Sequence, residues 1–191
     1  VSVTTPHIDH RPLAYAPALA ARLESAIDLV VIHCTELPDL ATARSFGERV
    51  LYPESGSGNC GHFYIDRDGR IEQWVELDHI AHHVRGYNER SVGIELVNRG
   101  RYPHWLSTAQ QQMEEPYAEL QINSLAGLLT YLCHCLPSLR WLAGHEDLDH
   151  DLVPATDDPA TLVRRKLDPG PLFPWERIRP TTSLLRWPEP A

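Results

Sequence analysis

The chain has 191 residues and a formal net charge of −9 at pH 7. The length fits one domain with a single hydrophobic core, and the negative charge argues against nucleic acid or an anionic membrane as a partner, because both are bound mainly through basic patches. No apolar run reaches the roughly 20 residues of a transmembrane helix, and residues 1–4 do not begin a charged and then hydrophobic leader. We therefore expect one domain without a transmembrane segment, acting on a small or polymeric substrate.

The cysteines indicate a reducing compartment. Cys34, Cys60, Cys133 and Cys135 lack the spacing of a zinc ribbon, and they are too few for a disulfide scaffold in a chain of this length. We expect free thiols and a cytoplasmic location. The periplasm or cell envelope is the alternative if a leader has been removed.

A run of four aliphatic residues, 29–32, leads directly into His33. Before it, residues 1–28 contain three prolines among short apolar groups and are predicted to form a surface arm. The aliphatic run predicts a strand that is buried on both faces. Because ligands gather at the carboxyl ends of strands in open α/β sheets, His33 is a candidate site residue.

The next segments predict a helix, a loop and a hairpin. Residues 40–52 have helical character, and residues 53–59 are predicted to form a flexible loop that could border a substrate site. Residues 62–66 and 70–75 flank an Asp-Gly dipeptide, which is typical of tight turns. They therefore predict two antiparallel strands.

Residues 91–98 alternate with a period of two. This pattern puts three aliphatic residues on one face of a strand and Glu95, with Gly93 as its neighbour, on the other. A carboxylate at such a position is costly unless it has a partner or a wet cleft, and a glycine leaves room for a ligand. Glu95 is therefore either a site residue or a glutamate on a solvated sheet face.

The second half of the chain predicts one long helix and one further strand. Ser107 and Gln110 predict a capped helix start, and Pro116 either begins or kinks the longer run that follows, in which leucines at helical spacing continue to Leu136. Their stripe belongs to the core. Residues 141–145 predict a strand that ends in a histidine, and the polar residues 153–165 predict an exposed loop.

Two strand-terminal histidines and a carboxylate before a proline make a candidate catalytic zinc site of His33, His145 and Asp168. Two neutral imidazoles and one carboxylate would leave the metal a net single positive charge, able to acidify water and to polarise a carbonyl. Lys166 lies two positions before Asp168 on a segment expected to be extended, so its ammonium would lie near the metal and suit a developing oxyanion. Glu95 is the candidate to carry the proton of the attacking water.

Other ligand sets stay open, because the sequence has 11 histidines. His150, Asp147 and Asp149 are rival ligands within an acidic run whose commonest meaning is a solvated loop. Cys34 could bind zinc as a thiolate, but it directly follows the first candidate histidine on a strand and therefore faces the opposite way. His62, His82, His83 and His134 are expected to be structural, with His83 as a candidate cleft wall.

Five segments that span most of residues 29–178 share the pattern of a known family: 31–33, 62–69, 91–96, 144–145 and 166–171. Together they resemble the type 2 N-acetylmuramoyl-L-alanine amidases, which are related to phage amidase lysozymes and to peptidoglycan recognition proteins. The resemblance implies a single α/β domain with a mixed central sheet flanked by helices. It also implies zinc on His33, His145 and Asp168, Glu95 and Lys166 in catalysis, and cleavage of the amide between the lactyl group of N-acetylmuramic acid and L-alanine.

Two positions depart from parts of that family. Some relatives, including the phage enzymes, have a tyrosine where this chain has Gly61, which favours a mechanism that uses Glu95 over one that uses a tyrosine. Phage-like and animal relatives use cysteine as the third ligand, whereas Asp168 resembles the bacterial branch that uses a carboxylate. The insert between His145 and Lys166 is also longer than in the simplest members.

The sequence thus predicts a zinc amidase of cell-wall turnover with peptidoglycan or muropeptides as substrate. We expect an N-terminal arm (1–28), a catalytic domain (29–178) and a C-terminal tail (179–191). The rival hypothesis is a non-catalytic peptidoglycan-binding protein that uses the same cleft, and a third is a zinc hydrolase of another amide or ester. A pure binder needs no intact metal triad, so the retained ligands favour the enzyme; the sugar form, the stem peptide and the oligomeric state stay open.

Overall fold

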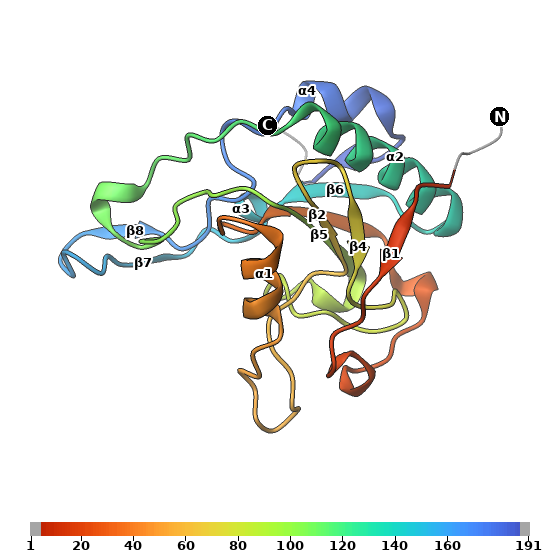
Figure 1. Cartoon of the computed structure of the whole chain (residues 1–191), viewed down its shortest axis with the longest axis horizontal. Coiled ribbons are helices and arrows are strands. Elements are labelled where there is room, and N and C mark those ends of the chain that lie inside the picture. The colour runs from red at the N-terminus through yellow and green to blue at the C-terminus, as the bar shows by residue number, and fades with distance from the viewer. Residues whose placement is uncertain (1–4, 188–191) are drawn as a thin grey trace.

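The computed structural model describes residues 5–187 of the chain. Within these residues, seven strands form a central sheet in the order β1-β4-β3-β5-β2-β6-β9 (Figure 1). Only β3 and β4 run antiparallel to each other, and the other neighbouring strands are parallel. The strands are β1 (Ile8–His10), β2 (Leu29–Cys34), β3 (Phe63–Ile65), β4 (Ile71–Gln73), β5 (Ser91–Leu96), β6 (Trp141–Gly144) and β9 (Leu185–Arg186).

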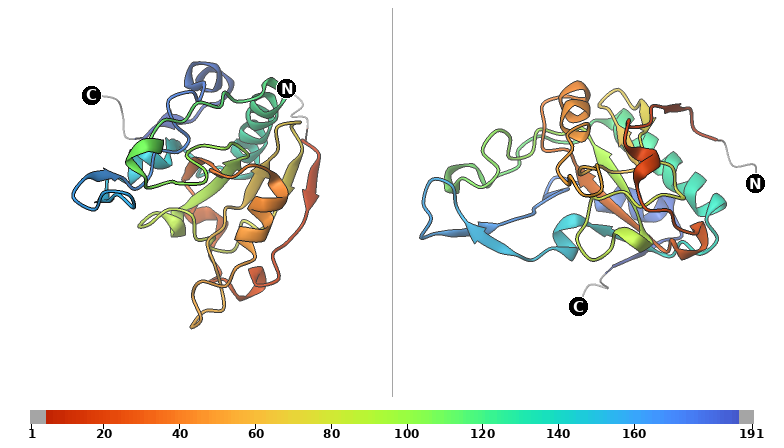
Figure 2. Two further views of the ribbon diagram at one scale, coloured as in Figure 1. Left: turned by 60° about the vertical axis from the view of Figure 1, so that its left-hand side comes forward. Right: turned by 90° about the horizontal axis from the view of Figure 1, so that it is seen from below.

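Helices cover both faces of this sheet (Figure 2). The α-helices are α1 (Leu40–Gly47), α2 (Glu119–Cys135), α3 (His145–Leu148) and α4 (Trp175–Ile178). Short 3-10 helices lie at Ala16–Ala18, Glu24–Ala26, Asn88–Arg90, Thr108–Gln110 and Arg179–Thr181. The predicted α/β domain with a mixed central sheet flanked by helices is confirmed.

Strand β2 buries both of its faces, and its side chains alternate between two hydrophobic clusters. Val30 and Ile32 pack with the leucines of α2. Leu29 and Val31 belong to a separate cluster. Because side chains alternate along a strand, His33 lies with Leu29 and Val31 on the face opposite α2.

Strand β5 follows the same rule, as its period-two pattern predicted. Its three aliphatic side chains at positions 92, 94 and 96 join the α2 cluster. Glu95 therefore lies on the opposite face, and it is the register partner of His33 on the neighbouring strand β2. The alternation of two adjacent parallel strands thus brings a histidine and a carboxylate to the same end of the same sheet face.

Helix α2 covers the sheet face that lies away from His33 and Glu95. Its buried side chains include the leucine stripe, so the stripe is core, as predicted. The buried amide of Gln121 donates to the carbonyls of Ile65 and Val97, at 2.9 and 3.0 Å, and ties the helix to the ends of β3 and β5. A buried amide is tolerated here because its donors are satisfied.

Two predicted elements differ from the structure. Ser107 caps only a 3-10 turn, and the long helix α2 begins after Pro116, at Glu119; in the intervening segment Glu115 binds Arg67 and the backbone of Arg99. Residues 153–165, predicted to be a loop, contain a β-hairpin of β7 (Leu152–Pro154) and β8 (Leu162–Arg164). This hairpin projects from the body of the domain (Figure 1).

The sheet extends beyond the predicted boundaries of the catalytic domain. From the predicted arm 1–28, β1 pairs with β4; from the predicted tail 179–191, β9 pairs with β6. Residues 1–4 and 188–191 lie outside the described residues, and the domain boundaries stay a prediction. All four cysteines are free thiols. Among residues 5–187, none of the helices combines the length and apolar composition needed to cross a bilayer.

Candidate metal centre

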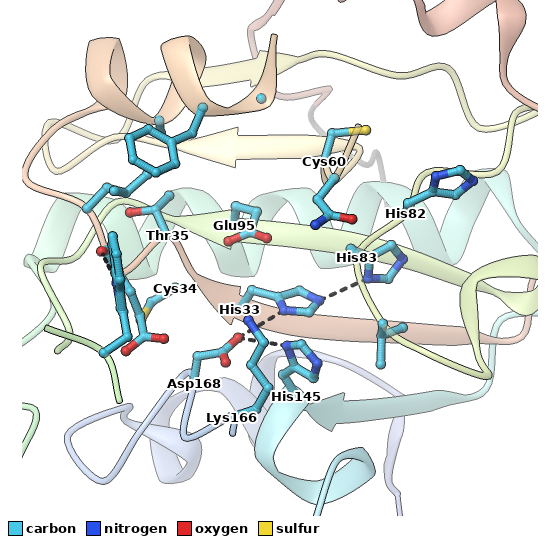
Figure 3. Close-up of a pocket in the computed structure, with 18 of the residues that line it drawn as sticks. His33, Cys34, Thr35, Cys60, His82, His83, Glu95, His145, Lys166 and Asp168 are labelled. Atoms are coloured by element: carbon cyan, nitrogen blue, oxygen red, sulfur yellow. Dashed lines mark hydrogen bonds and ion pairs between the residues drawn. The ribbon is translucent and has the colours of Figure 1, made fainter. Parts of the chain in front are cut away.

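Three buried side chains from distant parts of the chain meet at one point: His33, His145 and Asp168 (Figure 3). Nδ1 of His33 lies 2.9 Å from Oδ2 of Asp168, and Nδ1 of His145 lies 3.2 Å from the same oxygen. One potential ligand atom from each residue lies within 4.8 Å of the other two. The structure therefore brings together all three residues that the sequence predicted as ligands, in an arrangement that could hold a metal ion.

The sheet topology explains how the two histidines meet. Strands β2 and β6 are parallel neighbours, with Ile32 paired to Gly144. The residue after each of these is a histidine, His33 within β2 and His145 at the start of α3, so both imidazoles lie at the same carboxyl edge. In open sheets this edge is where ligands bind.

Backbone contacts hold Asp168 beside the two histidines. The N–H of Glu146, in the first turn of α3, donates to the carbonyl of Asp168 at 2.9 Å. Gly144 allows the approach, because a Cβ at this position would lie only 2.8 Å from Cδ of Pro169. A side chain at position 144 would therefore push the Asp168 segment away from the histidines.

A hydrogen-bond chain behind His33 determines which of its nitrogens carries a proton. Nε2 of His33 lies 2.9 Å from Nδ1 of His83, and Nε2 of His83 lies 3.2 Å from Oγ of Ser91. The Ser91 hydroxyl donates to the carbonyl of Tyr87 at 2.7 Å, so it accepts from His83. Neutral His83 then has its proton on Nε2 and accepts from Nε2–H of His33.

This proton arrangement leaves a lone pair on Nδ1 of His33, directed at a carboxylate oxygen of Asp168. Burial lowers the pKa of His33 to about 4, so the ring is neutral at pH 7. Burial raises the pKa of Asp168, but His145 and the nearby charge of Lys166 hold the pKa of this carboxyl well below its ordinary value, so the carboxylate is charged. Two electron pairs that face each other at 2.9 Å repel unless a cation lies between them, so this proton arrangement fits a bound metal ion.

The atoms without hydrogen-bond partners agree with this reading. Oδ1 of Asp168 and Nε2 of His145 are buried and unpartnered, although Nε2 of His145 lies 3.8 Å from the carboxylate of Asp149. A metal ligated by Nδ1 of His145 would leave Nε2–H facing that carboxylate, an arrangement common around metal-bound histidines. Two imidazoles and one carboxylate are a donor set used by catalytic zinc sites. The residues present therefore fit a zinc ion.

Glu95 and Lys166 line the same cleft as the three candidate ligands. Figure 3 shows the Glu95 carboxylate and the extended Lys166 side chain pointing into the space beside the cluster. Burial is the main cause that raises the pKa of Glu95 to about 8; the charge of Asp168 adds to the effect and that of Lys166 opposes it. A cation on Asp168 would oppose it further, which favours the proton-accepting carboxylate form.

Gly61, the position where some relatives have a tyrosine, makes room for Glu95. A Cβ at position 61 would lie 2.9 Å from Cγ of Glu95 and 3.2 Å from the carbonyl oxygen of Gly93. Any larger residue therefore requires the Glu95 side chain to move. In this chain, a side chain at position 61 is therefore incompatible with the present position of the Glu95 side chain.

The cleft has a volume of about 840 Å³ and a basic rim. Arg49, Arg85 and Arg165 line it together with Lys166, in a chain whose net charge is −9. Aromatic and aliphatic side chains lie between these charges: Leu37, Phe46, Leu51, Tyr52, Trp105 and Leu106. Such a surface suits an elongated ligand with carboxylate groups and apolar parts.

The rival ligands have other partners. His150 is exposed, and its Nε2 lies 2.9 Å from the carbonyl of Asp147. The carboxylate of Asp147 binds the backbone N–H of Gly144, and that of Asp149 binds Arg165. Cys34 is buried and lines the cleft without being part of the three-residue cluster.

Sequence reasoning missed two contributors. His83 was expected only as a cleft wall, yet it hydrogen-bonds to His33. Gly93 was the available signal, because a Cβ there would lie 2.6 Å from Cγ of His83. Arg101 was not singled out, although it is buried against the cleft.

Comparison with known proteins identifies the family. The model of a family described as N-acetylmuramoyl-L-alanine amidase matches residues 23–171. The 1,6-anhydro-N-acetylmuramyl-L-alanine amidase AmpD of Escherichia coli (strain K12) is 31% identical over 131 residues, which are 64% of this chain and 57% of that protein. The chain thus matches less than two thirds of this relative's length.

Two solved structures share the fold. N-acetylmuramoyl-L-alanine amidase LysC from Clostridium intestinale URNW has a TM-score of 0.66 at 23% identity, over 95% of this chain and 100% of that chain. The amidase AmiD from E. coli, in complex with the substrate anhydro-N-acetylmuramic acid-L-Ala-D-γ-Glu-L-Lys, has a TM-score of 0.59 at 23% identity, over 89% and 62%. Because the family match covers most of the chain, including the strands that end in His33 and His145, this protein belongs to the N-acetylmuramoyl-L-alanine amidase family.

Proposed function

We propose that this chain is a zinc-dependent N-acetylmuramoyl-L-alanine amidase. It hydrolyses the amide between the lactyl group of N-acetylmuramic acid and the L-alanine of the stem peptide, in peptidoglycan or in muropeptides. The observation that carries the proposal is the buried cluster of His33, His145 and Asp168, in which Nδ1 of His33 lies 2.9 Å from the Asp168 carboxylate while its Nε2 faces His83. It supports a cation at this point of a cleft that also contains Glu95 and Lys166.

His33, His145 and Asp168 would hold the zinc ion. When bound there, Zn²⁺ supplies a Lewis acid that lowers the pKa of water and polarises the amide carbonyl. The basicity and orientation of His33 depend on His83, and the geometry of Asp168 depends on its carbonyl bond to the first turn of α3.

Glu95 acts as the general base of the proposed reaction. Its carboxylate lies on the same sheet face and at the same register as His33, and it is partly exposed to the cleft. It takes a proton from the attacking water and passes it to the leaving nitrogen of L-alanine. Lys166 places an ammonium near the same point, where it stabilises the negative charge that develops on the carbonyl oxygen.

The charge of the cleft supports a stem-peptide substrate. Stem peptides carry free carboxylates, and Arg49 and Lys166 on the rim would attract them; Arg85 and Arg165 pair with Asp151 and Asp149. The ligand in the AmiD structure is a fragment of this kind, an anhydro-sugar with three amino acids attached. The four free thiols support the expected cytoplasmic location, with the periplasm or cell envelope as the alternative.

The test compares two substrates and one variant. Purified, zinc-loaded protein is incubated with intact sacculi and with anhydro-muropeptides, and the products are identified by mass spectrometry. The proposal expects release of peptides that begin with L-alanine, and loss of most of that release in Glu95→Gln. Binding of sacculi without release of peptide would instead support the non-catalytic peptidoglycan-binding protein. Release from another bond would refute the assigned linkage.

A further inference from the structure

A buried ion pair lies beside the cleft, between Glu36 and Arg101. Glu36 is 6% exposed and Arg101 is 1% exposed. Nε and Nη2 of Arg101 donate to the two carboxylate oxygens of Glu36 at 2.8 and 3.0 Å, and the backbone N–H of Arg101 donates to Oε1 at 3.2 Å. Glu36 lies only three residues after His33, at the carboxyl end of β2.

The remaining donors of Arg101 bind the segment that leads to Lys166 and Asp168. Nη1 donates to the carbonyl of Arg164 at 2.9 Å and to Oε1 of Gln111 at 3.3 Å. Nη2 donates to the carbonyl of Arg165 at 3.1 Å. All five N–H groups of this guanidinium therefore have partners, and one planar group joins the end of β2 to the residues just before Lys166.

The backbone around the pair is shaped for this contact. Glu36 has a positive φ of 49°, which is unfavourable for a residue with a side chain. Gly100 also has a positive φ, of 50°, and a Cβ there would lie 2.6 Å from Cγ of Glu36. The indole N–H of Trp105 donates to the carbonyl of Glu36 at 2.9 Å. Glu36 therefore carries backbone strain beside the ion pair, whereas Gly100 adopts its positive φ without strain and leaves room for the Glu36 side chain.

We propose that Arg101 is a positioning residue of the metal centre, and this inference rests on the proposed function. Through Glu36 it is fixed to the strand that ends in His33, and through two carbonyls it sets the path of the segment that carries Lys166 and Asp168. His33 and Asp168 belong to these two segments, so the distance between them depends on the guanidinium of Arg101. Lysine cannot replace it, because its three donors lack the planar fork that reaches a carboxylate and two carbonyls together.

A purely stabilising role is the alternative. Removing one partner of a buried ion pair destabilises a protein wherever the pair lies, so a loss of thermal stability does not distinguish the two roles. The control is Arg67→Met. Arg67 also binds a carboxylate with two nitrogens, that of Glu115, and donates to a carbonyl, that of Pro38, but these contacts lie away from residues 164–168.

The experiment measures metal binding, which needs no turnover. Arg101→Met, Arg101→Lys and Arg67→Met are prepared metal-free and titrated with Zn²⁺ against a chelator, and the Co²⁺-loaded forms are compared by visible absorption, which depends on ligand geometry. We expect Arg101→Met to bind Zn²⁺ about 10- to 100-fold more weakly, as for other residues that orient ligands. The Co²⁺ spectrum of Arg101→Met should also change. Arg101→Lys should restore little of the lost Zn²⁺ affinity, and Arg67→Met should match the wild type in both Zn²⁺ affinity and Co²⁺ spectrum.

Kinetics and a milder variant complete the test. On muropeptides, Arg101→Met should lower kcat more than it raises KM, because Lys166 and Asp168 shift, whereas Arg165 is the only rim arginine that belongs to the same segment. If Arg101→Met does not fold, Glu36→Gln, which keeps the shape of the partner, should change the Co²⁺ spectrum in the same direction. Wild-type Zn²⁺ affinity and Co²⁺ spectrum in the folded variants would overturn the inference. Normal metal binding by a wild type that cleaves no amide would refute the proposed function alone.

Discussion

His83 determines the protonation of His33: their ring nitrogens, Nδ1 of His83 and Nε2 of His33, lie 2.9 Å apart. The bond is one link in a chain that continues through Ser91 to the carbonyl of Tyr87. This series of hydrogen bonds ends on a carbonyl oxygen, which can only accept. The donor in each preceding bond is therefore fixed, and Nε2 of His33 carries a proton. His83 thus leaves Nδ1 of His33 unprotonated, and this is the nitrogen that would bind the metal.

Removing His83 should therefore weaken metal binding without unfolding the domain. In His83→Ala, the Nε2–H of His33 loses its acceptor and the ring can rotate, so we expect a zinc affinity about 10- to 100-fold lower. The neighbouring His82 lines the cleft but contacts Tyr52 rather than His33, so His82→Ala is the matched control. Chelator competition measures both. Equal zinc affinities in the two variants would contradict the role assigned to His83.

Gly61→Ala should impair catalysis while the metal stays bound. The added Cβ would lie 2.9 Å from Cγ of Glu95, so the carboxylate has to move from its place beside His33. Displacement of a reacting group by about 1 Å can cost roughly 10²-fold in rate. Zinc content and single-turnover rates on muropeptides test this.

The control for this substitution is Gly127→Ala. Gly127 lies in α2, where a Cβ would meet nothing within 4 Å, so this variant should keep the wild-type rate and gain up to about 1 kcal/mol of stability. A wild-type rate in Gly61→Ala would show that the position of Glu95 is not important for the reaction.

Glu95→Gln should keep zinc and the fold but lose about 10²- to 10⁴-fold in rate, because glutamine has nearly the same shape and cannot accept a proton from water. Initial rates on anhydro-muropeptides at fixed zinc occupancy provide the measurement. A rate close to that of the wild type would assign the base to another group, and Glu146, whose pKa burial raises to about 7, would then be examined next.

Lys166 and Asp168 are two residues apart, but their substitutions should have different effects on zinc content and rate. Asp168→Ala removes a ligand, so zinc content and rate should fall together. Lys166→Met keeps the apolar stem and loses the ammonium, so it should retain zinc while the chemical step slows by about 10²- to 10³-fold. A salt bridge of Lys166 to Asp157 or Asp158 would be the alternative role, but both acids have other partners: Asp157 binds Ser107 and Thr108, and Asp158 binds Thr161. An unchanged single-turnover rate in zinc-loaded Lys166→Met would remove Lys166 from the mechanism.

The parts of the fold that the sequence predicted are those governed by local periodicity. The aliphatic run of β2, the alternation of β5 and the leucine stripe of α2 each specify a buried face within a few residues, and the alternation alone placed Glu95 on the face opposite its aliphatic neighbours. The meeting of His33 and His145 followed from the rule that strand ends gather ligands.

The parts that were missed depend on contacts between distant residues. Strands β1 and β9 are only three and two residues long and exist through pairing with β4 and β6. The hairpin of β7 and β8 likewise forms from a polar stretch without a strand-like apolar pattern. The contacts of His83 with His33, 50 residues apart, and of Arg101 with Glu36, 65 residues apart, depend on loop paths that no local pattern specifies.

Metal content measured together with activity tests the central claim most directly. The protein is stripped of metal by chelation, its zinc is counted, and hydrolysis of muropeptides is followed as Zn²⁺ is added back to the wild type and to Asp168→Ala. We predict that wild-type activity disappears on stripping and returns in proportion to zinc up to about one ion per chain, and that Asp168→Ala recovers neither zinc nor activity at the same concentrations. Full activity in metal-free wild-type protein would contradict the account.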